Sequence, residues 1–466
     1  MDSTKVRRFG EQVKRFRARF AQGCGSALGS LLGQAELEHW IARHSEGCRL
    51  RIYSPLITLG LFIDQVMSAD QSCQDAVARG VSARVSQGEE PCGLNNGPYC
   101  KARQRLALPL LKELCDTLGR RMVKAQPTAW RWRGREVKLI DGATLSMPDT
   151  AANQQAYPQV TQQKAGLGFP IVRMVGIISL SCGAILEWAQ GPCEGKKSGE
   201  TSMLWNMGEG LSRGDIVLAD RYYAGYFMLA RLLDQGVDVV TRQHQLRHTR
   251  FQRGEHLGKC DHVVLWSRPP CPAWMDKALY AAMPETLRLR ECRVGGWILV
   301  SSLCDAGAVS KQDLRELYGW RWHIELDFRA IKAVMQMDVL RCKTPAMIDK
   351  EIAAHLLAYN LVRSVMAQAA ALTTLLPRQF SFKGALQQLR TFERNIRHGK
   401  RVLLDQAHNG LLRGIAQLKL PHRPDRMEPR AVKRRGKNLP FLTQPRDIER
   451  ARLLALRQQY IRTQNA

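Results

Sequence analysis

The sequence lacks the cysteine spacing, the long apolar run and the signal segment that mark several protein classes. None of its 13 cysteines forms a Cys-x-x-Cys pair, and the odd, scattered set argues against both a zinc ribbon and a disulfide framework. The longest charge-free apolar stretch, around residues 174–186, is too short and too rich in serine and glycine to span a bilayer. The first residues carry charge without an adjoining apolar segment, so we expect no secretory signal and a cytoplasmic location.

Acidic residues are also in short supply. There are 42 Asp and Glu against 70 Lys and Arg, which gives a formal net charge of +28 and an isoelectric point near 10.0. Such an excess is the electrostatic footprint of a protein that neutralises phosphates. A polyanionic partner is therefore expected, and no membrane.

The 466 residues, with 45% hydrophobic content, suffice for roughly two to four domains. Runs of apolar residues with strand-like and helix-like spacing alternate after about residue 129, which predicts an α/β sheet. We expect strands at 137–140, 171–180, 184–189, 216–219, 237–241 and 297–302, with helices at 202–211 and 225–233 between them. We expect helices at 14–20, 35–42, 55–67, 71–78 and 101–123 in front of the sheet.

The predicted organisation has five parts, of which the middle three form one interrupted core. They are a helical N-terminal DNA-binding domain (1–128), the first part of the core (129–242), a β-rich insertion (243–296), the second part of the core (297–395) and a basic C-terminal tail (396–466). The tail interleaves cations with proline between residues 423 and 437, a composition that cannot build a core and suits phosphate binding. The stretch 446–460 is a candidate amphipathic helix for contact with a partner subunit or DNA.

The helix expected at 101–123 opens with three cations, Lys101, Arg103 and Arg105. This arrangement makes it a candidate for contacting DNA. A solvated basic helix face is the alternative, because no helix-turn-helix spacing accompanies the charges.

The segment 318–332 has the most informative side-chain pattern. At about 100° per residue, Tyr318, Arg321, Glu325 and Lys332 fall within roughly 60° of one another and form one polar stripe on a helix. A neighbouring apolar stripe that can seat the helix on a core consists of Trp320, Ile324, Phe328 and Ile331. The alternative is an exposed salt-bridge row, in which Arg321 and Glu325 at i,i+4 would contribute only a few tenths of a kcal/mol.

Two aspartates each terminate an apolar run. Asp141 follows Val-Lys-Leu-Ile and precedes Gly142, and Asp220 follows Ile-Val-Leu-Ala. Each is expected at the carboxyl end of a buried strand, where sheets open toward ligands. Either one alone is more often a strand leaving into a turn. Asp149 is a less favoured substitute for Asp141, because it lies in a Met-Pro-Asp-Thr loop.

Two strand-end aspartates and an inward-facing glutamate are what two Mg²⁺ ions over a scissile phosphate require. Mn²⁺ is a possible replacement. We assign the bridge between the ions to Asp141, and the remaining ligands to Asp220 and Glu325. Arg321 and Lys332 would hold the flanking phosphate oxygens, and Tyr318 can donate a hydrogen bond to a phosphate.

With these acids upstream, the Tyr-Arg-Glu-Lys spacing resembles the DDE transposases of bacterial insertion sequences, most closely the group of insertion-sequence family four. The resemblance also includes Gly168-Phe-Pro-Ile-Val-Arg173, Gly195-Lys-Lys-Ser-Gly-Glu200 and Leu218-Ala-Asp-Arg221, and it covers roughly residues 85–360. It implies an RNase H-like catalytic core that is interrupted by a β-rich insertion between the second Asp and the Glu. Residues 221–324 leave room for one.

The resemblance further implies cut-and-paste transposition on double-stranded DNA, with the terminal inverted repeats and target DNA as substrates. It implies a homodimer in the synaptic complex and association with the bacterial nucleoid. Trp297 occupies a place where family members stack on a flipped base, although it could equally be a core residue of its strand. Two alternatives remain: a nuclease of the same fold without strand transfer, and a catalytically silent DNA-binding regulator.

Overall fold

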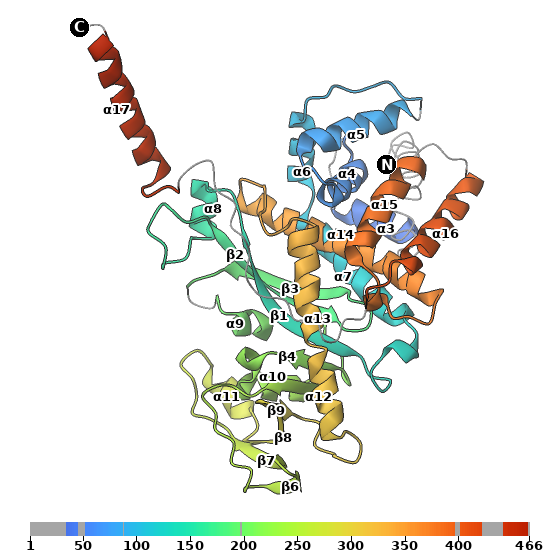
Figure 1. The fold of residues 1–466 in the computed structure, drawn as a ribbon, viewed down its shortest axis with the longest axis vertical. Coiled ribbons are helices and arrows are strands. Elements are labelled where there is room, and N and C mark those ends of the chain that lie inside the picture. The colour runs from blue at the N-terminus through green and yellow to red at the C-terminus, as the bar shows by residue number, and fades with distance from the viewer. Residues whose placement is uncertain are drawn as a thin grey trace.

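The structure, a computed structural model, describes residues 34–44, 52–86, 88–195, 198–396, 401–421 and 441–464. The helix expected at 14–20 and the proline-interleaved basic segment at 423–437 lie outside these residues. The described chain is a mixed α/β structure built on one large sheet (Figure 1).

The described chain begins with helices. They are α3 (Gln34–His44), α4 (Pro55–Met67), α5 (Cys73–Val85), α6 (Gly97–Arg105) and α7 (Leu108–Ala125), followed by the 3₁₀ turn η1 (Thr128–Trp130). The single helix expected at 101–123 is wrong, because it is divided between α6 and α7. Ala107 is extended, with φ −72° and ψ 130°. Pro109 lacks the N–H that a helix interior needs, so it is accommodated in the first turn of a new helix.

The sheet has nine strands in the order β3-β2-β1-β4-β5-β9-β8-β7-β6. Their bounds are β1 (Val137–Ser146), β2 (Ile171–Ser179), β3 (Ile185–Pro192), β4 (Ile216–Ala219), β5 (Asp238–Arg242), β6 (Glu255–Gly258), β7 (Asp261–Ser267), β8 (Thr286–Val294) and β9 (Trp297–Ser301). β4 runs parallel to both β1 and β5, and every other neighbouring pair is antiparallel.

Both faces of the central strands are buried, which explains why they are continuous apolar runs. In β4, Ile216 and Leu218 join a core shared with α4, α7 and α14, whereas Val217 and Ala219 join a second core with α10. Side chains alternate between the faces of a strand, so four consecutive apolar residues supply both cores. The front helices therefore share their core with the sheet.

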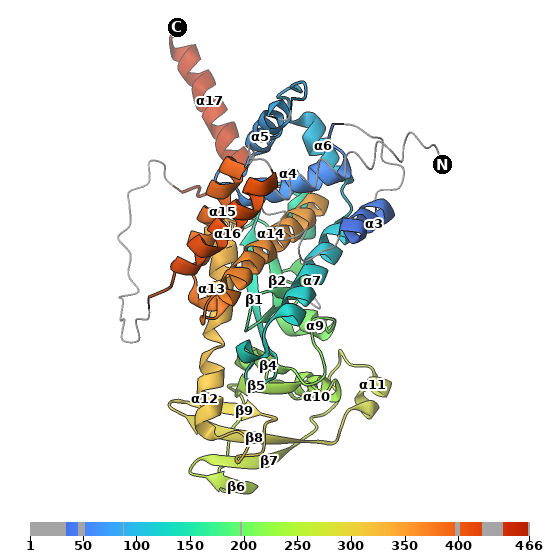
Figure 2. The same ribbon diagram turned by 90° about the vertical axis from the view of Figure 1, so that its right-hand side faces the viewer.

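The chain between β5 and β9 extends the same sheet. Strands β6, β7 and β8 continue it beyond β9, at the end of the molecule farthest from the C-terminus (Figure 2). The helices between β1 and β9 in the chain are α8 (Ala151–Ala156), α9 (Glu200–Trp205), the 3₁₀ turn η2 (Arg221–Tyr223), α10 (Tyr226–Asp234) and α11 (Lys277–Ala282).

Helix α14 is the central helix of the chain that follows β9. It spans Pro345–Ala371, and residues on all its faces are buried because α4, α7, α15 and α16 pack around it. The other elements are α12 (Lys311–Gly319), α13 (Trp322–Arg329), the π-helical turn η3 (Ala330–Val334), the 3₁₀ turn η4 (Pro377–Gln379), α15 (Phe382–Ile396), α16 (Arg401–Gln417) and α17 (Arg446–Gln464). Helix α17 projects away from the body (Figures 1 and 2).

A buried ion-pair network joins α13 to α14. The Asp327 carboxylate is fully buried and accepts hydrogen bonds from Arg378 (2.8 and 2.9 Å), from the Tyr359 hydroxyl (3.0 Å) and from Arg363. A buried carboxylate is tolerated only when its charge is paired and its oxygens are hydrogen-bonded. The network therefore fixes the side of α13 that faces α14.

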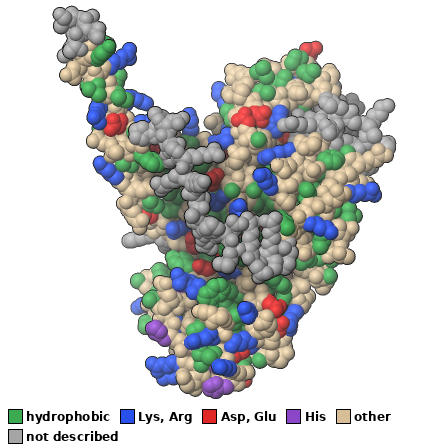
Figure 3. Space-filling model, viewed as in Figure 1, with side chains coloured by type: hydrophobic (Ala, Val, Ile, Leu, Met, Phe, Trp, Pro, Cys, Tyr) green, Lys and Arg blue, Asp and Glu red, His purple; other side chains and the backbone are tan. Residues whose placement is uncertain are grey.

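Basic side chains are spread over the face of the molecule drawn in Figure 3. On the face drawn in Figure 3, Lys and Arg side chains lie over both the helical half and the lower strands and are not gathered in one patch. Within the described residues, no helix combines the length and apolarity needed to cross a membrane.

Replacing Asp327 with Ala should strongly destabilise the fold. The change leaves two buried guanidinium groups without their counter-charge, and breaking a buried pair in this way costs about 3–5 kcal/mol. Urea unfolding of the purified protein measures the cost. Glu255→Ala is the control: it breaks a surface pair with Arg288 in which both side chains are more than half exposed, so about 0–1 kcal/mol is expected. Equal effects of the two substitutions would contradict the network's role.

Candidate functional site

Asp141 and Asp220 lie side by side where two parallel strands meet. The register pairs Leu139 with Leu218, and counting on by two residues brings Asp141 level with Asp220. The expectation that Asp141 ends its strand is wrong, because β1 continues to Ser146 through its pairing with β2. Strand β4 does end, at Ala219, so Asp220 leaves the sheet and its carboxylate accepts the Tyr222 N–H (2.7 Å).

The polar stripe expected on one helix is divided between three elements. Tyr318 lies in α12, Glu325 in α13 and Lys332 in η3. A 3₁₀-type turn joins α12 to α13, in which the Arg321 N–H donates to the Tyr318 carbonyl (3.0 Å). Because the chain stays helical through this turn, Tyr318, Arg321 and Glu325 remain near one another.

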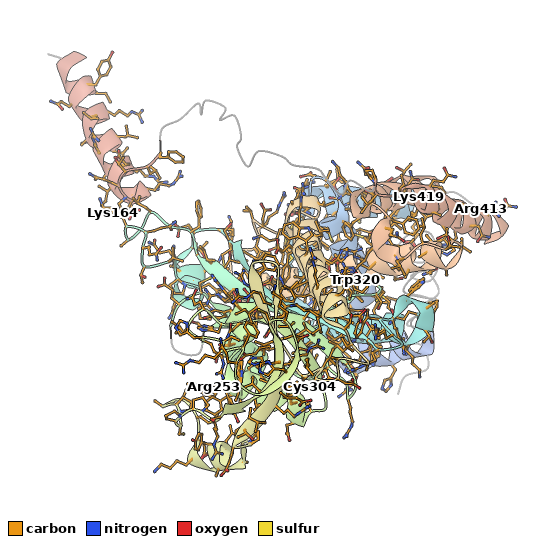
Figure 4. The ribbon with its side chains drawn as sticks, turned by 60° about the horizontal axis from the view of Figure 1, so that its bottom comes forward. Lys164, Arg253, Cys304, Trp320, Arg413 and Lys419 are labelled. Carbon is orange, nitrogen blue, oxygen red and sulfur yellow. The ribbon has the colours of Figure 1, made fainter. Side chains whose placement is uncertain are left out.

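The expected apolar stripe is largely correct, with one exception. Ile324, Phe328 and Ile331 are buried in the core. Trp320 is wrong as a core residue, because it is 41% exposed and projects from the junction of α12 and α13 (Figure 4).

Arg321 joins the acid on the sheet to the acid on the helix. Its guanidinium donates to Glu325 Oε1 at 2.8 Å and to Asp141 Oδ2 at 3.4 Å. Asp141 Oδ1 accepts the N–H of Gly142 (2.8 Å). The two carboxylates thus lie on either side of one cation. The predicted i,i+4 pair exists, but only 18% of the Arg321 side chain is exposed, so this pair is not a solvated surface row.

Asp141 is ionised less readily than an ordinary aspartate. Its pKa is raised from 3.8 to about 6, chiefly by burial; the Gly142 N–H and Arg321 oppose the shift, and the nearby Asp220 and Glu200 charges add to it. The cause is desolvation of the charged form together with like charges. A further cation beside Asp141 would therefore be stabilised by this site.

Aromatic side chains flank the acids. Tyr318 is buried, and burial raises the pKa of its hydroxyl, with the Asp220 charge adding to the shift. The Trp297 ring lies edge-on to the Tyr318 ring, 6.4 Å between centroids, and Arg242 lies over it at 5.0 Å. Trp297 is 49% exposed, so it is not a core residue of β9. The exposed ring could stack against a base.

Sequence reasoning missed two side chains of this region, Glu200 and Tyr223. Glu200 opens α9 and accepts a hydrogen bond from the buried Tyr223 hydroxyl (3.0 Å). Its Oε1 lies 3.8 Å from Arg173 Nε. Glu200 and Arg173 both belong to stretches that resemble the transposase motifs, and Gly142 immediately after Asp141 was a second available signal.

The three cations at the start of the 101–123 segment do not share one face. Lys101 and Arg105 are exposed, but Arg103 is buried and donates to Gln65 (3.3 Å) and to the Cys73 sulfur (3.1 Å). Its guanidinium also lies 4.9 Å from the centre of the Phe62 ring. Arg103 is therefore wrong as a DNA contact. It holds α6 against α4 and α5.

Among the described residues, no three His, Cys, Asp or Glu side chains are already arranged to hold a metal ion. The side chains around Asp141 nevertheless have suitable chemistry, because they offer carboxylate oxygens, which hard divalent cations prefer. Asp149 is separate from them, and its carboxylate accepts a hydrogen bond from Gln154 (2.8 Å). The arrangement can bind a cation or, through Arg321, an anion such as a phosphate.

Comparison with known proteins identifies three similarities. Residues 132–361 match the family model described as the transposase DDE domain. The chain is 28% identical over 351 residues to the transposase InsG of insertion sequence element IS4 from Escherichia coli (strain K12), covering 72% of this chain and 76% of that protein. A cryo-EM structure of the piggyBac transposase synaptic complex with hairpin DNA aligns with a TM-score of 0.44 and 9% identity, covering 84% of this chain and 85% of that one.

Asp141→Asn should remove a pH dependence of stability. A raised carboxyl pKa means that the folded state binds a proton more tightly than the unfolded state, so stability is lost as pH rises from about 4 to about 6. Over this window the wild type should lose on the order of 3 kcal/mol relative to Asp141→Asn. Urea unfolding in EDTA at several pH values measures the difference, and parallel curves for the two proteins would refute the shift.

Arg103→Gln and Lys101→Gln should have opposite effects. The first disrupts buried hydrogen bonds and should cost about 1–3 kcal/mol of stability without changing DNA affinity. The second should change stability by less than about 0.5 kcal/mol, and if Lys101 contacts a phosphate it should reduce the salt dependence of DNA binding by about one ion. Melting curves and fluorescence anisotropy over a salt series separate the two roles. Weakened DNA binding in a fully folded Arg103→Gln protein would contradict the assignment.

Proposed function

The chain belongs to the DDE transposases of insertion-sequence family four, and we propose that it cleaves DNA at the ends of an insertion sequence and joins the freed 3′ ends to target DNA. Asp141, Asp220 and Glu325 are the proposed catalytic residues. Both steps are in-line displacements at phosphorus in which only the nucleophile changes, so one acidic site can serve both.

We assign an RNase H-like core to the part of the sheet that carries the acids. The strand order β3-β2-β1-β4-β5, with an antiparallel β1-β2-β3 meander and parallel β4 and β5, supports this assignment. Helices on both faces support it further. The β-rich insertion is then the chain between β5 and β9.

The observation that carries the proposal is the shared guanidinium of Arg321. It links Asp141 on β1 with Glu325 on α13, residues 184 positions apart in the chain, while Asp220 is level with Asp141 on the neighbouring strand. Acids from three separate segments therefore surround one region. If Arg321 and Glu325 formed only a solvent-exposed salt bridge, there would be no reason for Asp220 to lie nearby or for Asp141 to be buried.

Divalent ions fit this group of side chains. The donors are carboxylate oxygens, and the raised pKa of Asp141 reflects burial beside other acids, which a cation would relieve. Two Mg²⁺ or Mn²⁺ ions would activate the attacking hydroxyl and stabilise the leaving oxygen. Asp141 would hold both ions, with Asp220 and Glu325 completing the two sets of ligands.

Positively charged and aromatic side chains would hold the DNA. Arg321 would exchange its carboxylate partners for a phosphate that flanks the scissile bond, and the half-buried Lys332 would hold another. Tyr318 would donate to a phosphate, and Trp297 would stack on an unpaired base. Lys101 and Arg105 would add contacts to double-stranded terminal repeats or target DNA. A homodimer would bring the two ends together, as the family implies.

Substituting Asp141→Asn, Asp220→Asn or Glu325→Gln should abolish cleavage while DNA binding persists. Loss of about 4 kcal/mol of transition-state stabilisation lowers a rate on the order of 10³-fold. The measurement is cleavage of a labelled DNA duplex that carries the element's end, in Mg²⁺, with binding followed by anisotropy.

Asp149→Asn is the matched control and should cleave normally, because its carboxylate lies apart from the site. Cleavage by Asp220→Asn at the wild-type rate would refute the assignment. A strand-transfer assay with precleaved ends separates the transposase from a nuclease that never joins DNA, and absence of metal-dependent cleavage in the wild type would favour the silent regulator.

A further inference from the structure

Glu200 is a fourth carboxylate beside the proposed site. Burial is the main cause of the raised pKa values of Asp141 and of the Tyr223 hydroxyl, and the Glu200 charge adds to both. The side chain is 25% exposed, so it is neither a core residue nor a fully solvated one. Neither the proposed triad nor the Tyr-Arg-Glu-Lys stripe includes it.

The backbone next to Asp141 is shaped to admit this carboxylate. A Cβ added to Gly142 would lie 2.3 Å from Glu200 Cδ and 2.4 Å from Oε1. At these distances any side chain at position 142 would displace the Glu200 carboxylate from its place. Because Gly142 has no side chain, the Glu200 carboxylate can lie directly against the backbone next to Asp141.

Surrounding residues hold Glu200 in this position. The Tyr223 hydroxyl, which is buried, donates to Oε2 at 3.0 Å. Arg173 donates to the Ser198 carbonyl (3.1 Å), and its Nε lies 3.8 Å from Oε1, beyond hydrogen-bond distance. Oε1 thus keeps bonding capacity on the side of Gly142 and Asp141.

We propose that Glu200 is an additional metal ligand, which supplies a carboxylate oxygen to the divalent ion shared by Asp141 and Asp220. The proposal rests on the proposed function, because it assigns a residue to that same site. In this role Tyr223 is a positioning residue: it holds one oxygen of Glu200 and leaves the other for the ion. A merely structural Glu200 would need the hydrogen bond to Tyr223 but not the close approach to Gly142.

Mn²⁺ binding to the full-length protein tests the proposal without relying on activity. Free Mn²⁺ is followed by electron paramagnetic resonance during titration of the wild type, Glu200→Gln, Asp141→Asn and Glu194→Gln. Glu200→Gln keeps the shape of the side chain and the Tyr223 partner but removes the charge, so its Kd should rise about 10-fold or more. Glu194→Gln is the matched control, because Glu194 lies in the same segment and bonds only Thr161 in the described contacts (3.0 and 3.1 Å).

The outcomes separate this inference from the proposed function. Weaker binding by Glu200→Gln but not by Glu194→Gln supports the inference. Wild-type affinity in Glu200→Gln, together with lost affinity in Asp141→Asn, overturns the inference and leaves the triad in place. Wild-type affinity in both variants overturns the metal site as a whole. If circular dichroism shows that Glu200→Gln does not fold, Glu200→Asp decides: its shorter side chain withdraws the carboxylate, so weaker binding supports the role and wild-type affinity refutes it.

Discussion

The position of Glu325 depends on the buried ion pairs of Asp327. Residues two apart on a helix point in nearly opposite directions, so the side of α13 that buries Asp327 in the network with Arg363 and Arg378 turns Glu325 toward β1. Any rotation of α13 would leave three charges unpaired in the interior, at a cost of several kcal/mol. The helix that carries the third acid is therefore fixed from behind, by contacts that do not touch the site.

The front of the same helix is held by a weaker and more exchangeable contact. Arg321 spans 2.8 Å to Glu325 but 3.4 Å to Asp141, and both acids are partly open to solvent. A phosphate can compete for this guanidinium, since planar bidentate recognition of carboxylates and of phosphates uses the same fork. The buried ion pairs on one side of α13 stabilise the fold, whereas the partly exposed Arg321 contacts on the other side can exchange partners.

Much of the sheet, and the place of Asp220 directly after a strand, could be predicted from the sequence, because buried strands appear as apolar runs. The predicted 216–219 strand matches β4, and helix 55–67 matches α4. The extent of β1 was not predictable, since Asp141, Gly142 and Thr144 interrupt its apolar pattern and only pairing with β2 continues it. The burial of Arg103 and the exposure of Trp320 were likewise not predictable. A cation is usually exposed and a tryptophan usually buried, and only the tertiary contacts of these two residues reverse that preference. Glu200 was missed because it opens helix α9 and approaches Gly142 of β1 only in the folded chain.

The far edge of the sheet has a consequence for how such a chain can diversify. Because the segment between β5 and β9 is added strand by strand outside β9, it ends in the short, largely exposed β6, whose free edge borders no other strand among the described residues. Hairpins can be appended or trimmed there while the ladder next to the acids keeps its register. The strands that hold Asp141 and precede Asp220, β1 and β4, lie inside the sheet and are separated from this edge by β5, β9, β8 and β7, so an added strand beside β6 need not disturb them.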